Sequence, residues 1–399
     1  MGALTCGLRV NMRSSWIFVI ASTLLVSASA AAWDVVDKDL EGRTFTHAKA
    51  SFGGYIQPRF RFSPDDTEVG STGEVGFSVQ RMRLELEGSF SAPGPKNFPF
   101  TLRQKTSIEL MPDPRLQDAY VDFALGTPFQ VRLGQFKAPS SRTNLTSDMG
   151  AMFPDKPLIA SFGPEREMGA MFFGWWGKRL IEWNVGVFNG EGRNRVSNVN
   201  RKVMVVGRVA FSPLGSPGMA AEVLHDWSFK DDATIRPTFT VGYSITHNTI
   251  GPLGQQEAIL AHDVDGFFHY RFFTAQGEFW YRTSDFEELS VSDYKQTGWY
   301  AQLSAFWFGV PWAQEHLALL GRVEQGDAYI PSADIPPAGP LDPAQATRRI
   351  TAGVGFFAGK PMFRLVQDLR FVASYTVKQE LEDLPLNNDE FNLSMNLNF

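Results

Sequence analysis

The segment FNLSMNLNF, Phe391 to Phe399, alternates apolar and polar side chains without an error. Phenylalanine, leucine and methionine occupy every odd position, and asparagine or serine occupies every even position. Successive side chains of a β-strand point to opposite faces of its sheet, so the pattern predicts a strand with one apolar and one polar face. A phenylalanine stands at each end of this strand.

The same alternation recurs along the chain from Phe52 onward. Its clearest internal example is FPFTLRQKTSIEL, residues 98–110, in which one parity is largely apolar and the other carries Arg103, Lys105 and Glu109. Turn-forming segments rich in glycine, proline and asparagine separate such runs. The runs recur about every 20 to 25 residues, which predicts a ladder of hairpins with about 16 strands. Further examples are RMRLELEGSF (81–90), IEWNVGVFNG (181–190) and WYAQLSAFWF (299–308).

Two architectures are built from such strands. In a soluble sandwich or propeller the apolar parity faces a packed core, whereas in a transmembrane barrel it faces lipid and the polar parity faces the lumen. Aromatic residues make up 13% of the chain, with 34 Phe and 10 Trp, beside a hydrophobic content of only 43%. This balance favours the barrel, because aromatic girdles mark both membrane interfaces. We therefore expect an all-β, transmembrane, antiparallel up-and-down β-barrel.

The N-terminal segment has the features of a secretory signal peptide. Arg9 and Arg13 precede an apolar run at 16–28, and Ala28-Ser29-Ala30 supplies a cleavage signal. The run is shorter than the ~20 residues that a spanning helix needs, although a retained anchor helix is the alternative. The expected organisation is a cleaved signal peptide at 1–31, a lead-in segment at 32–50 and the barrel at 51–399.

Composition excludes several functions. The single cysteine, Cys6, lies in the predicted signal peptide, so disulfides, zinc-thiolate sites and cysteine nucleophiles are excluded from the mature chain. Loss of Arg9 and Arg13 with this peptide would take the formal net charge from −6 to −8, and nothing indicates nucleic-acid binding.

No G-x-S-x-G elbow accompanies the six histidines. His225-Asp226 and His262-Asp263 are sequence neighbours whose side chains should point to opposite faces. We expect no enzyme, no cofactor and no metal.

Several further stretches occur in a characteristic order along the mature chain: EGRTFTHAKASFGGYIQPRFRF (41–62), LQDAYVDFALGTPFQVRLGQFKAP (116–139), FGPEREMGAMFFG (162–174), NVGVFNGEGRN (184–194) and VVGRVAFSPLG (205–215). With the aromatic-ended last strand, their order and spacing resemble the phosphate-selective porin O and P family of Gram-negative outer membranes, over essentially the whole mature region. The resemblance implies a barrel of sixteen strands, usually trimeric, whose long third loop folds into the lumen and which passes phosphate or polyphosphate along basic side chains. It also implies that Phe399 is the C-terminal aromatic presented to the barrel assembly machinery.

An anion pathway needs cations that face the lumen, and the planar fork of arginine suits phosphate oxygens. The candidates on the polar parity are Arg59, Arg61, Arg81, Arg83, Arg103, Lys105 and Arg132. Acids share this parity, among them Glu85, Glu109 and Asp118. These cations could therefore form a basic ladder for anions or simply belong to a mixed-charge lumen wall, and the sequence leaves both interpretations open.

The segment 137–166 is the candidate constriction loop, because it is the longest stretch in the first half without clean alternation. It contributes Lys137, Arg142 and Arg166 as candidate pathway residues. The alternative for Lys137 and Arg166 is that they anchor the loop to the wall by salt bridges.

The patterns predict a barrel of the Gram-negative outer membrane, and the family resemblance implies a porin for passive diffusion of small hydrophilic solutes, with anions such as phosphate or polyphosphate favoured. One alternative is a general or sugar-acid porin with a mixed-charge lumen. Another is a non-conducting barrel that serves as an anchor or adhesin. The expected partners are outer-membrane lipid and lipopolysaccharide, the barrel assembly machinery, small anionic solutes and two further copies of the chain in a homotrimer.

Overall fold

The computed structural model describes residues 33–35, 47–64, 74–93, 99–215, 237–252, 255–287, 293–307, 316–327, 346–358, 368–381 and 389–399. The expected signal peptide and the pair His225-Asp226 lie outside these residues. The helical segments within them are two single turns, α2 (Arg142–Leu145) and η2 (Leu158–Ser161). Among the described helices, none is long and apolar enough to cross a membrane.

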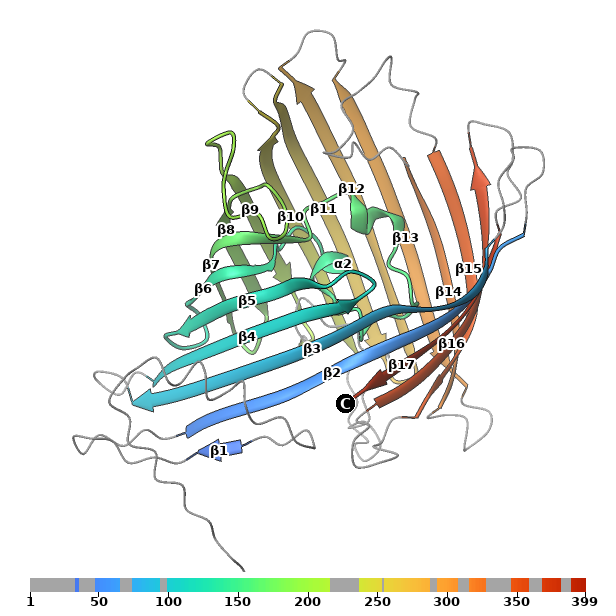
Figure 1. Ribbon diagram of the computed structural model, residues 1–399, viewed down its shortest axis with the longest axis horizontal. Coiled ribbons are helices and arrows are strands. Elements are labelled where there is room, and N and C mark those ends of the chain that lie inside the picture. The colour runs from blue at the N-terminus through green and yellow to red at the C-terminus, as the bar shows by residue number, and fades with distance from the viewer. Residues whose placement is uncertain are drawn as a thin grey trace, which may run out of the picture.

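Sixteen of the strands that the structure describes form one closed antiparallel barrel (Figure 1). Each strand pairs with its neighbour in the chain, and the last strand pairs with the first of the ring. A short strand, β1 (Trp33–Val35), adds to the start of β2. The ring consists of β2 (His47–Phe62), β3 (Val75–Pro93), β4 (Pro99–Met111), β5 (Arg115–Ala124), β6 (Gln130–Lys137), β7 (Arg166–Trp176), β8 (Ile181–Phe188), β9 (Met204–Phe211), β10 (Thr238–Ile250), β11 (Glu257–Tyr270), β12 (Phe273–Phe286), β13 (Tyr294–Phe306), β14 (Leu317–Asp327), β15 (Ala346–Phe357), β16 (Asp368–Glu380) and β17 (Glu390–Asn398).

The predicted fold class is therefore confirmed, with one shifted boundary. The first barrel strand begins at His47, inside the segment expected to be a lead-in. Its early residues pair with the end of β3, from His47 opposite Ser91 to Ala50 opposite Gly88. Hydrogen bonding to a long partner strand thus extends β2 beyond the residues whose side chains alternate.

The barrel closes at the segment FNLSMNLNF. Phe391 lies opposite Phe62, and beyond the last strand residue the amide of Phe399 donates to the carbonyl of Gly54 at 3.0 Å. The amide of Gly54 donates back to the carbonyl of Phe399 at 2.9 Å. A Cβ at Gly54 would stand 2.3 Å from the carbonyl oxygen of Arg83, so this junction requires glycine.

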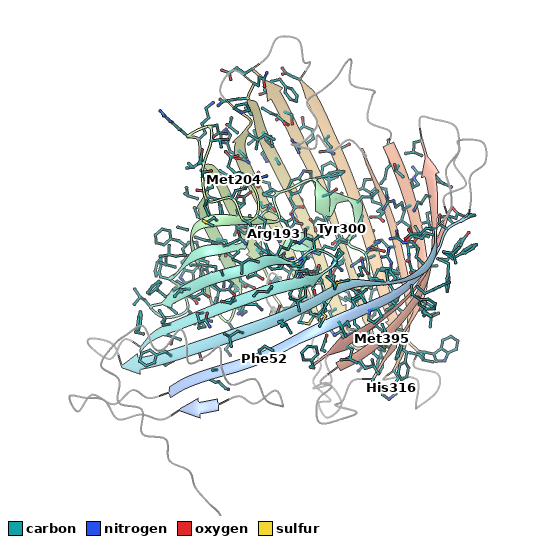
Figure 2. The ribbon with its side chains drawn as sticks, viewed as in Figure 1. Phe52, Arg193, Met204, Tyr300, His316 and Met395 are labelled. Carbon is teal, nitrogen blue, oxygen red and sulfur yellow. The ribbon has the colours of Figure 1, made fainter. Side chains whose placement is uncertain are left out.

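The apolar parity of the strands faces outward. On β17, Leu393 is 43% exposed whereas its neighbour Asn392 is 3% exposed, and on β13 Trp299 is exposed while Tyr300 is buried. Side chains stand on both faces of the wall (Figure 2). This is the arrangement of a barrel with an outer apolar surface and an inner polar surface, the reverse of a soluble sandwich.

Aromatic side chains gather at strand ends. At one rim, Phe129 precedes β6, Trp176 ends β7 and Trp183 lies near the start of β8. Their ring centroids lie 5.8 to 6.4 Å apart. Toward the opposite rim, Phe60 and Phe77 lie 4.9 Å apart. Clusters at both ends are typical of the girdles at two membrane interfaces.

The prediction for His262-Asp263 is confirmed: the two side chains point to opposite faces of β11. His262 shares a hydrogen bond with the hydroxyl of Tyr243 at 2.8 Å on the outer face. Asp263 is fully buried and accepts from Arg208 at 3.2 Å on the inner face. No group of three potential metal ligands gathers among the described residues.

Candidate functional site

The segment between β6 and β7 lies inside the barrel. Figure 1 shows α2 enclosed between the strands β2 to β6 and the strands β10 to β13. We call residues 137–166 the inner loop, and residues 148–155 its tip. The geometry of the lumen follows from what each part of this loop contacts.

Lys137 and Arg166 hold the two ends of the inner loop and are direct cross-strand partners. Arg166 is 2% exposed, and its Nε donates to Oδ1 of Asp118 at 3.0 Å while Nη1 donates to Oε1 of Glu165 at 2.6 Å. The ammonium of Lys137 donates to the carbonyl of Thr146 at 2.5 Å. These are anchoring contacts, and a role of either side chain in an anion pathway stays a prediction.

The first half of the inner loop docks on the wall formed by β10 to β13. Arg142 is completely buried, and its Nε donates to Oδ1 of Asp265 at 2.8 Å. The amide and hydroxyl of Thr143 both donate to Glu278, at 3.0 and 2.7 Å. The hydroxyl of Ser244 donates to the carbonyl of Ser140. Because the guanidinium of Arg142 is buried between the loop and the wall, a solute in the lumen does not reach it in this conformation.

The side chain of Ser141 starts α2. Its hydroxyl accepts from the amide of Asn144 at 3.0 Å, which is the usual N-cap bond of serine. Asn144 in turn donates to Ser140 and to the carbonyl of Pro164, so the two arms of the loop are joined. The sequence SSRTN thus makes one turn of helix at the point where the chain meets the wall.

The tip of the inner loop faces arginines of β2 and β3. Nη2 of Arg83 donates to Oδ2 of Asp148 at 3.1 Å, and Nη1 of Arg59 donates to Oδ1 of Asp155 at 2.8 Å. Nη1 of Arg81 donates to the carbonyl of Pro154 at 3.3 Å. Three of the predicted pathway arginines therefore bind the loop itself.

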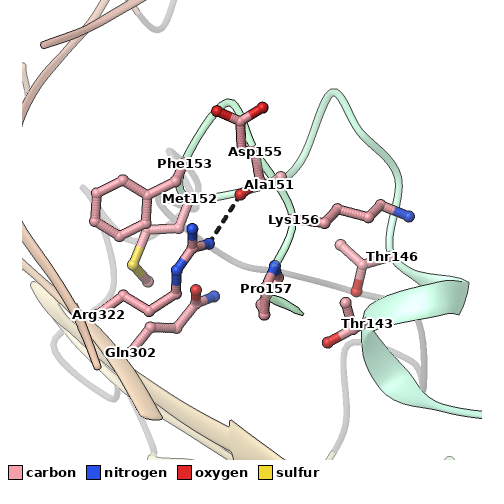
Figure 3. Close-up of a pocket in the computed structure, with 10 residues that line it drawn as sticks. All are labelled: Thr143, Thr146, Ala151, Met152, Phe153, Asp155, Lys156, Pro157, Gln302 and Arg322. Atoms are coloured by element: carbon pink, nitrogen blue, oxygen red, sulfur yellow. Dashed lines mark hydrogen bonds between the residues drawn. The ribbon is translucent and has the colours of Figure 1, made fainter. Parts of the chain in front are cut away.

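Two arginines from strands beyond the closing strand β17 bind the main chain of the tip. Arg322 of β14 donates to the carbonyl of Asp155 at 2.8 Å, as Figure 3 shows. Arg370 of β16 donates to the carbonyl of Met149 at 2.7 Å. The tip is thus held by five arginines from four strands, all on the arc of the wall that runs from β14 through β17 to β3.

Apolar side chains fix the rest of the loop. Met152 and Phe153 pack in a buried cluster with Phe306, Leu320 and Phe357. Ile159 and Phe162 pack in another with Trp280 and Tyr300. The alternation of the strands does not reveal that these wall residues receive the loop. The available signal was an apolar residue on the otherwise polar parity, such as Phe306 between Ala305 and Trp307.

Cations and acids at the loop set its electrostatics. Burial raises the pKa of Asp148, but the nearby charges of Lys156 and Arg81 outweigh burial and hold this pKa well below its usual range. Burial likewise raises the pKa of Glu165, and Arg166 and Arg193 outweigh it, so the pKa is lowered. Both carboxylates are therefore ionised at neutral pH.

The remaining predicted cations lie on the inner face of β2 to β6, and most of them are paired. Lys105 lies 2.8 Å from both Glu85 and Glu87. Arg132 donates to Asp122 at 2.7 and 2.9 Å and its guanidinium stacks on Tyr120 at 3.8 Å. The other two are Arg61, which pairs with Glu74 and Glu390 at 3.1 Å, and Arg103, which donates to Gln130.

Open space remains beside this wall. A cavity of about 370 Å³ is lined by residues of β2 to β6. The described residues around it include the cations Lys49, Arg103, Lys105 and Arg132 and the acids Glu87 and Asp122. The cavity therefore carries more positive than negative side chains, although individual cations within it are paired.

Comparison with known proteins identifies the family. The model of the family described as phosphate-selective porin O and P matches residues 51–313, well over half of the chain. The chain belongs to this porin family. It is a non-enzymatic channel of the outer membrane through which small solutes diffuse. No individual curated protein matches the porin in sequence.

Solved structures confirm the barrel of this porin. The anion-selective porin from Comamonas acidovorans superposes with a TM-score of 0.59 at 11% identity, covering 88% of this chain and 100% of that one. OmpF of Salmonella typhi in complex with daunomycin gives 0.56 at 9% identity, with 92% and 100% covered. OmpT of Vibrio cholerae, in its trimer form, gives 0.55 at 8% identity, with 88% and 99% covered. At these identities the likeness concerns the fold alone.

Proposed function

We propose that this porin conducts small hydrophilic anions, inorganic phosphate among them, along the β2 to β6 side of the inner loop. The observation that carries the proposal is the excess of cations around the 370 Å³ cavity on this wall. Lumen-facing cations favour entry of an anion, and their pairing with acids keeps binding weak enough for release. The family to which the chain belongs is described as phosphate-selective, which supports the same cargo.

The position of the inner loop supports this route. On the β10 to β13 side, Arg142 and Thr143 are buried against the wall, and Arg208 is buried between Asp263 and Asp265. On that side the loop is in direct contact with the wall. We infer that the loop narrows the pore and directs solutes toward Arg59, Arg81 and Arg103. The fully buried Arg142 is not part of the proposed route.

A second candidate is a general or sugar-acid porin with a mixed-charge lumen. The observation that favours it is that Arg61, Arg83, Lys105 and Arg132 each lie within hydrogen-bonding distance of a carboxylate. Such a pore would show weak charge preference and no specific effect of phosphate. A non-conducting anchor or adhesin would give no channels at all.

Planar-bilayer recording separates these functions. In a KCl gradient, the reversal potential of the purified porin should have the sign of a chloride-preferring channel, and added phosphate should reduce the chloride current. Arg103→Gln should move the reversal potential toward zero. The matched control is Lys178→Gln, because Lys178 lies exposed in the turn between β7 and β8, outside the cavity. A cation-preferring or unselective wild type would reject the anion route.

We also propose the finer partners. OmpT of Vibrio cholerae forms a trimer and shares the fold, which supports a homotrimer here. Three equal conductance steps on insertion would support the homotrimer. Single steps, together with a protein that stays monomeric after chemical crosslinking, would reject it. Contact with lipopolysaccharide, recognition of Phe399 by the barrel assembly machinery and cleavage of residues 1–31 remain proposals that rest on the sequence patterns.

A further inference from the structure

We propose that the carboxylate of Asp155 occupies an oxyanion site on the lumen wall and competes there with permeating anions. The inference deepens the proposed anion conduction and rests on it. The site consists of Arg59 and Gln80, and Asp155 is the ligand that this chain supplies to it. Displacement of the carboxylate by a phosphate oxyanion then sets how tightly the pore holds its solute.

The geometry of this contact is that of a bound anion. Nη1 of Arg59 donates to both carboxylate oxygens of Asp155, at 2.8 and 3.0 Å. Nε2 of Gln80 donates to Oδ1 at 2.8 Å. A charged guanidinium and an amide on a carboxylate would serve phosphate oxygens equally well, because both ligands are acceptors with a delocalised negative charge.

The strands place these two donors together through an irregularity. Gln57 of β2 lies opposite Arg81, but Pro58 lies opposite Val79, so Gln80 is an extra residue in β3. Such a bulge re-aims a side chain out of the regular alternation. Gln80 therefore joins Arg59 at the lumen face although the neighbouring Arg81 also reaches the loop.

Exposure distinguishes Asp155 from the other acid of the tip. The side chain of Asp155 is 42% exposed, whereas that of Arg59 is 7% exposed. The side chain of Asp148 is only 5% exposed and pairs with the buried Arg83. A solute can therefore reach Asp155 and replace it, while Arg59 stays fixed in the wall. By its low exposed fraction, Asp148 instead has a structural role in holding the tip.

The carboxylate can leave without release of the loop, because other groups hold the main chain. Arg322 donates to the carbonyl of Asp155 at 2.8 Å, and Arg81 donates to the carbonyl of Pro154 at 3.3 Å. Figure 3 shows the guanidinium of Arg322 directed at this main-chain oxygen and the carboxylate of Asp155 turned away from it. Phe153 also stays packed against Phe306 and Phe357.

The test replaces the competing charge while keeping the shape of the side chain. Asp155→Asn should lower the phosphate concentration that halves the chloride conductance by about fivefold. A change of this size corresponds to the free energy that a half-exposed ion pair contributes. It should also shift the reversal potential further toward chloride. Asp113→Asn is the matched control, because Asp113 is exposed in the turn between β4 and β5 and its loss changes the net charge equally. This control should leave both quantities unchanged.

A second variant identifies the site itself. With Arg59→Gln added to Asp155→Asn, the fivefold decrease in the half-inhibiting phosphate concentration should disappear, because the guanidinium that binds the phosphate is gone. An unchanged half-inhibition concentration in Asp155→Asn, or an equal change in Asp113→Asn, would overturn the inference. Circular dichroism and gel migration with and without heating confirm a folded barrel. If Asp155→Asn does not fold, Asp155→Ser, which removes the same charge, decides in its place.

Failure of the proposed function gives a different result. A wild-type pore that phosphate does not inhibit would contradict anion conduction as proposed. In that case the inference still predicts that inhibition becomes measurable in Asp155→Asn, because the site is then free of its own carboxylate. Absence of inhibition in both proteins overturns both proposals, and inhibition in the wild type with no change in Asp155→Asn overturns the inference alone.

Discussion

At the scale of single residues, the carboxylate of Asp148 couples the inner loop to pH. Its folded-state pKa lies well below the value of about 3.9 expected in the unfolded chain, so its contribution to stability is complete above that value and is lost as the pH falls below it. We expect the unfolding temperature of the wild type to fall steeply below about pH 4.

Asp148→Asn should reduce this pH dependence. At neutral pH the variant should cost about 2 kcal/mol of unfolding free energy, because Arg83 and Lys156 lose a charged acceptor. Thermal unfolding of both proteins between pH 3 and about 7 measures the two effects. Parallel curves for wild type and variant would show that other carboxylates dominate acid unfolding.

Arg166 is the second residue with a direct stability prediction. It is buried and neutralises Asp118 and Glu165 at the end of the inner loop. Arg166→Gln should cost about 3 kcal/mol, because Asp118 is left charged and buried. Arg166→Lys should cost less, since the charge is kept and only the fork geometry is lost. Denaturant unfolding measures both, and equal costs for Gln and Lys would argue against a charge-based anchor.

At the scale of secondary structure, Gly134 controls how β6 leads into the inner loop. Its φ is +128°, and a Cβ there would lie 2.2 Å from the carbonyl oxygen of Ala119. Gly134→Ala should therefore cost at least about 2 kcal/mol and lower the yield of folded barrel. Gly266→Ala in β11 is the control, because a Cβ there meets nothing within 4 Å. Heat-dependent gel migration reports the folded fraction, and equal yields would reject the steric argument.

The strands themselves were largely predictable, whereas their irregularities were not. Alternation placed Trp299, Leu303 and Leu393 on the outer face correctly, because the side-chain period of a strand is a local property. Alternation did not reveal that Gln80 is an extra residue in β3. A bulge is defined by two strands together, and one strand's pattern does not contain its partner's register.

At the scale of the whole molecule, the excess positive charge around the cavity should make selectivity depend on salt. The Debye length is about 10 Å at 0.1 M ionic strength and about 3 Å at 1 M. Chloride preference should therefore be clear near 0.1 M KCl and much smaller near 1 M. Reversal potentials in gradients of equal ratio but different mean concentration measure this, and a constant preference would indicate selection by direct contact instead.

Closure of the barrel provides a second prediction at this scale. Deletion of Phe399 removes both backbone hydrogen bonds with Gly54 and the aromatic ring beside that glycine. We expect less folded protein in the outer membrane, and Phe399→Tyr should restore it because the main chain and the ring are kept. Quantification in membrane fractions measures this. Equal loss in the deletion and in Phe399→Tyr would contradict the role of an aromatic residue.

The sequence by itself determined the strands, their two faces and the closing segment, since these follow from a period of two residues repeated along the chain. Its aromatic content then favoured a membrane barrel over a soluble sandwich. The sequence also singled out Arg59, Arg81 and Arg83, which contact the inner loop. Only the tertiary structure decided which acid each cation meets. Arg59 and Asp155 are separated by 96 positions, and Arg142 and Asp265 by 123. Such partners come together only when the sheet closes into a barrel and the inner loop enters it. The alternation within one strand cannot predict these contacts.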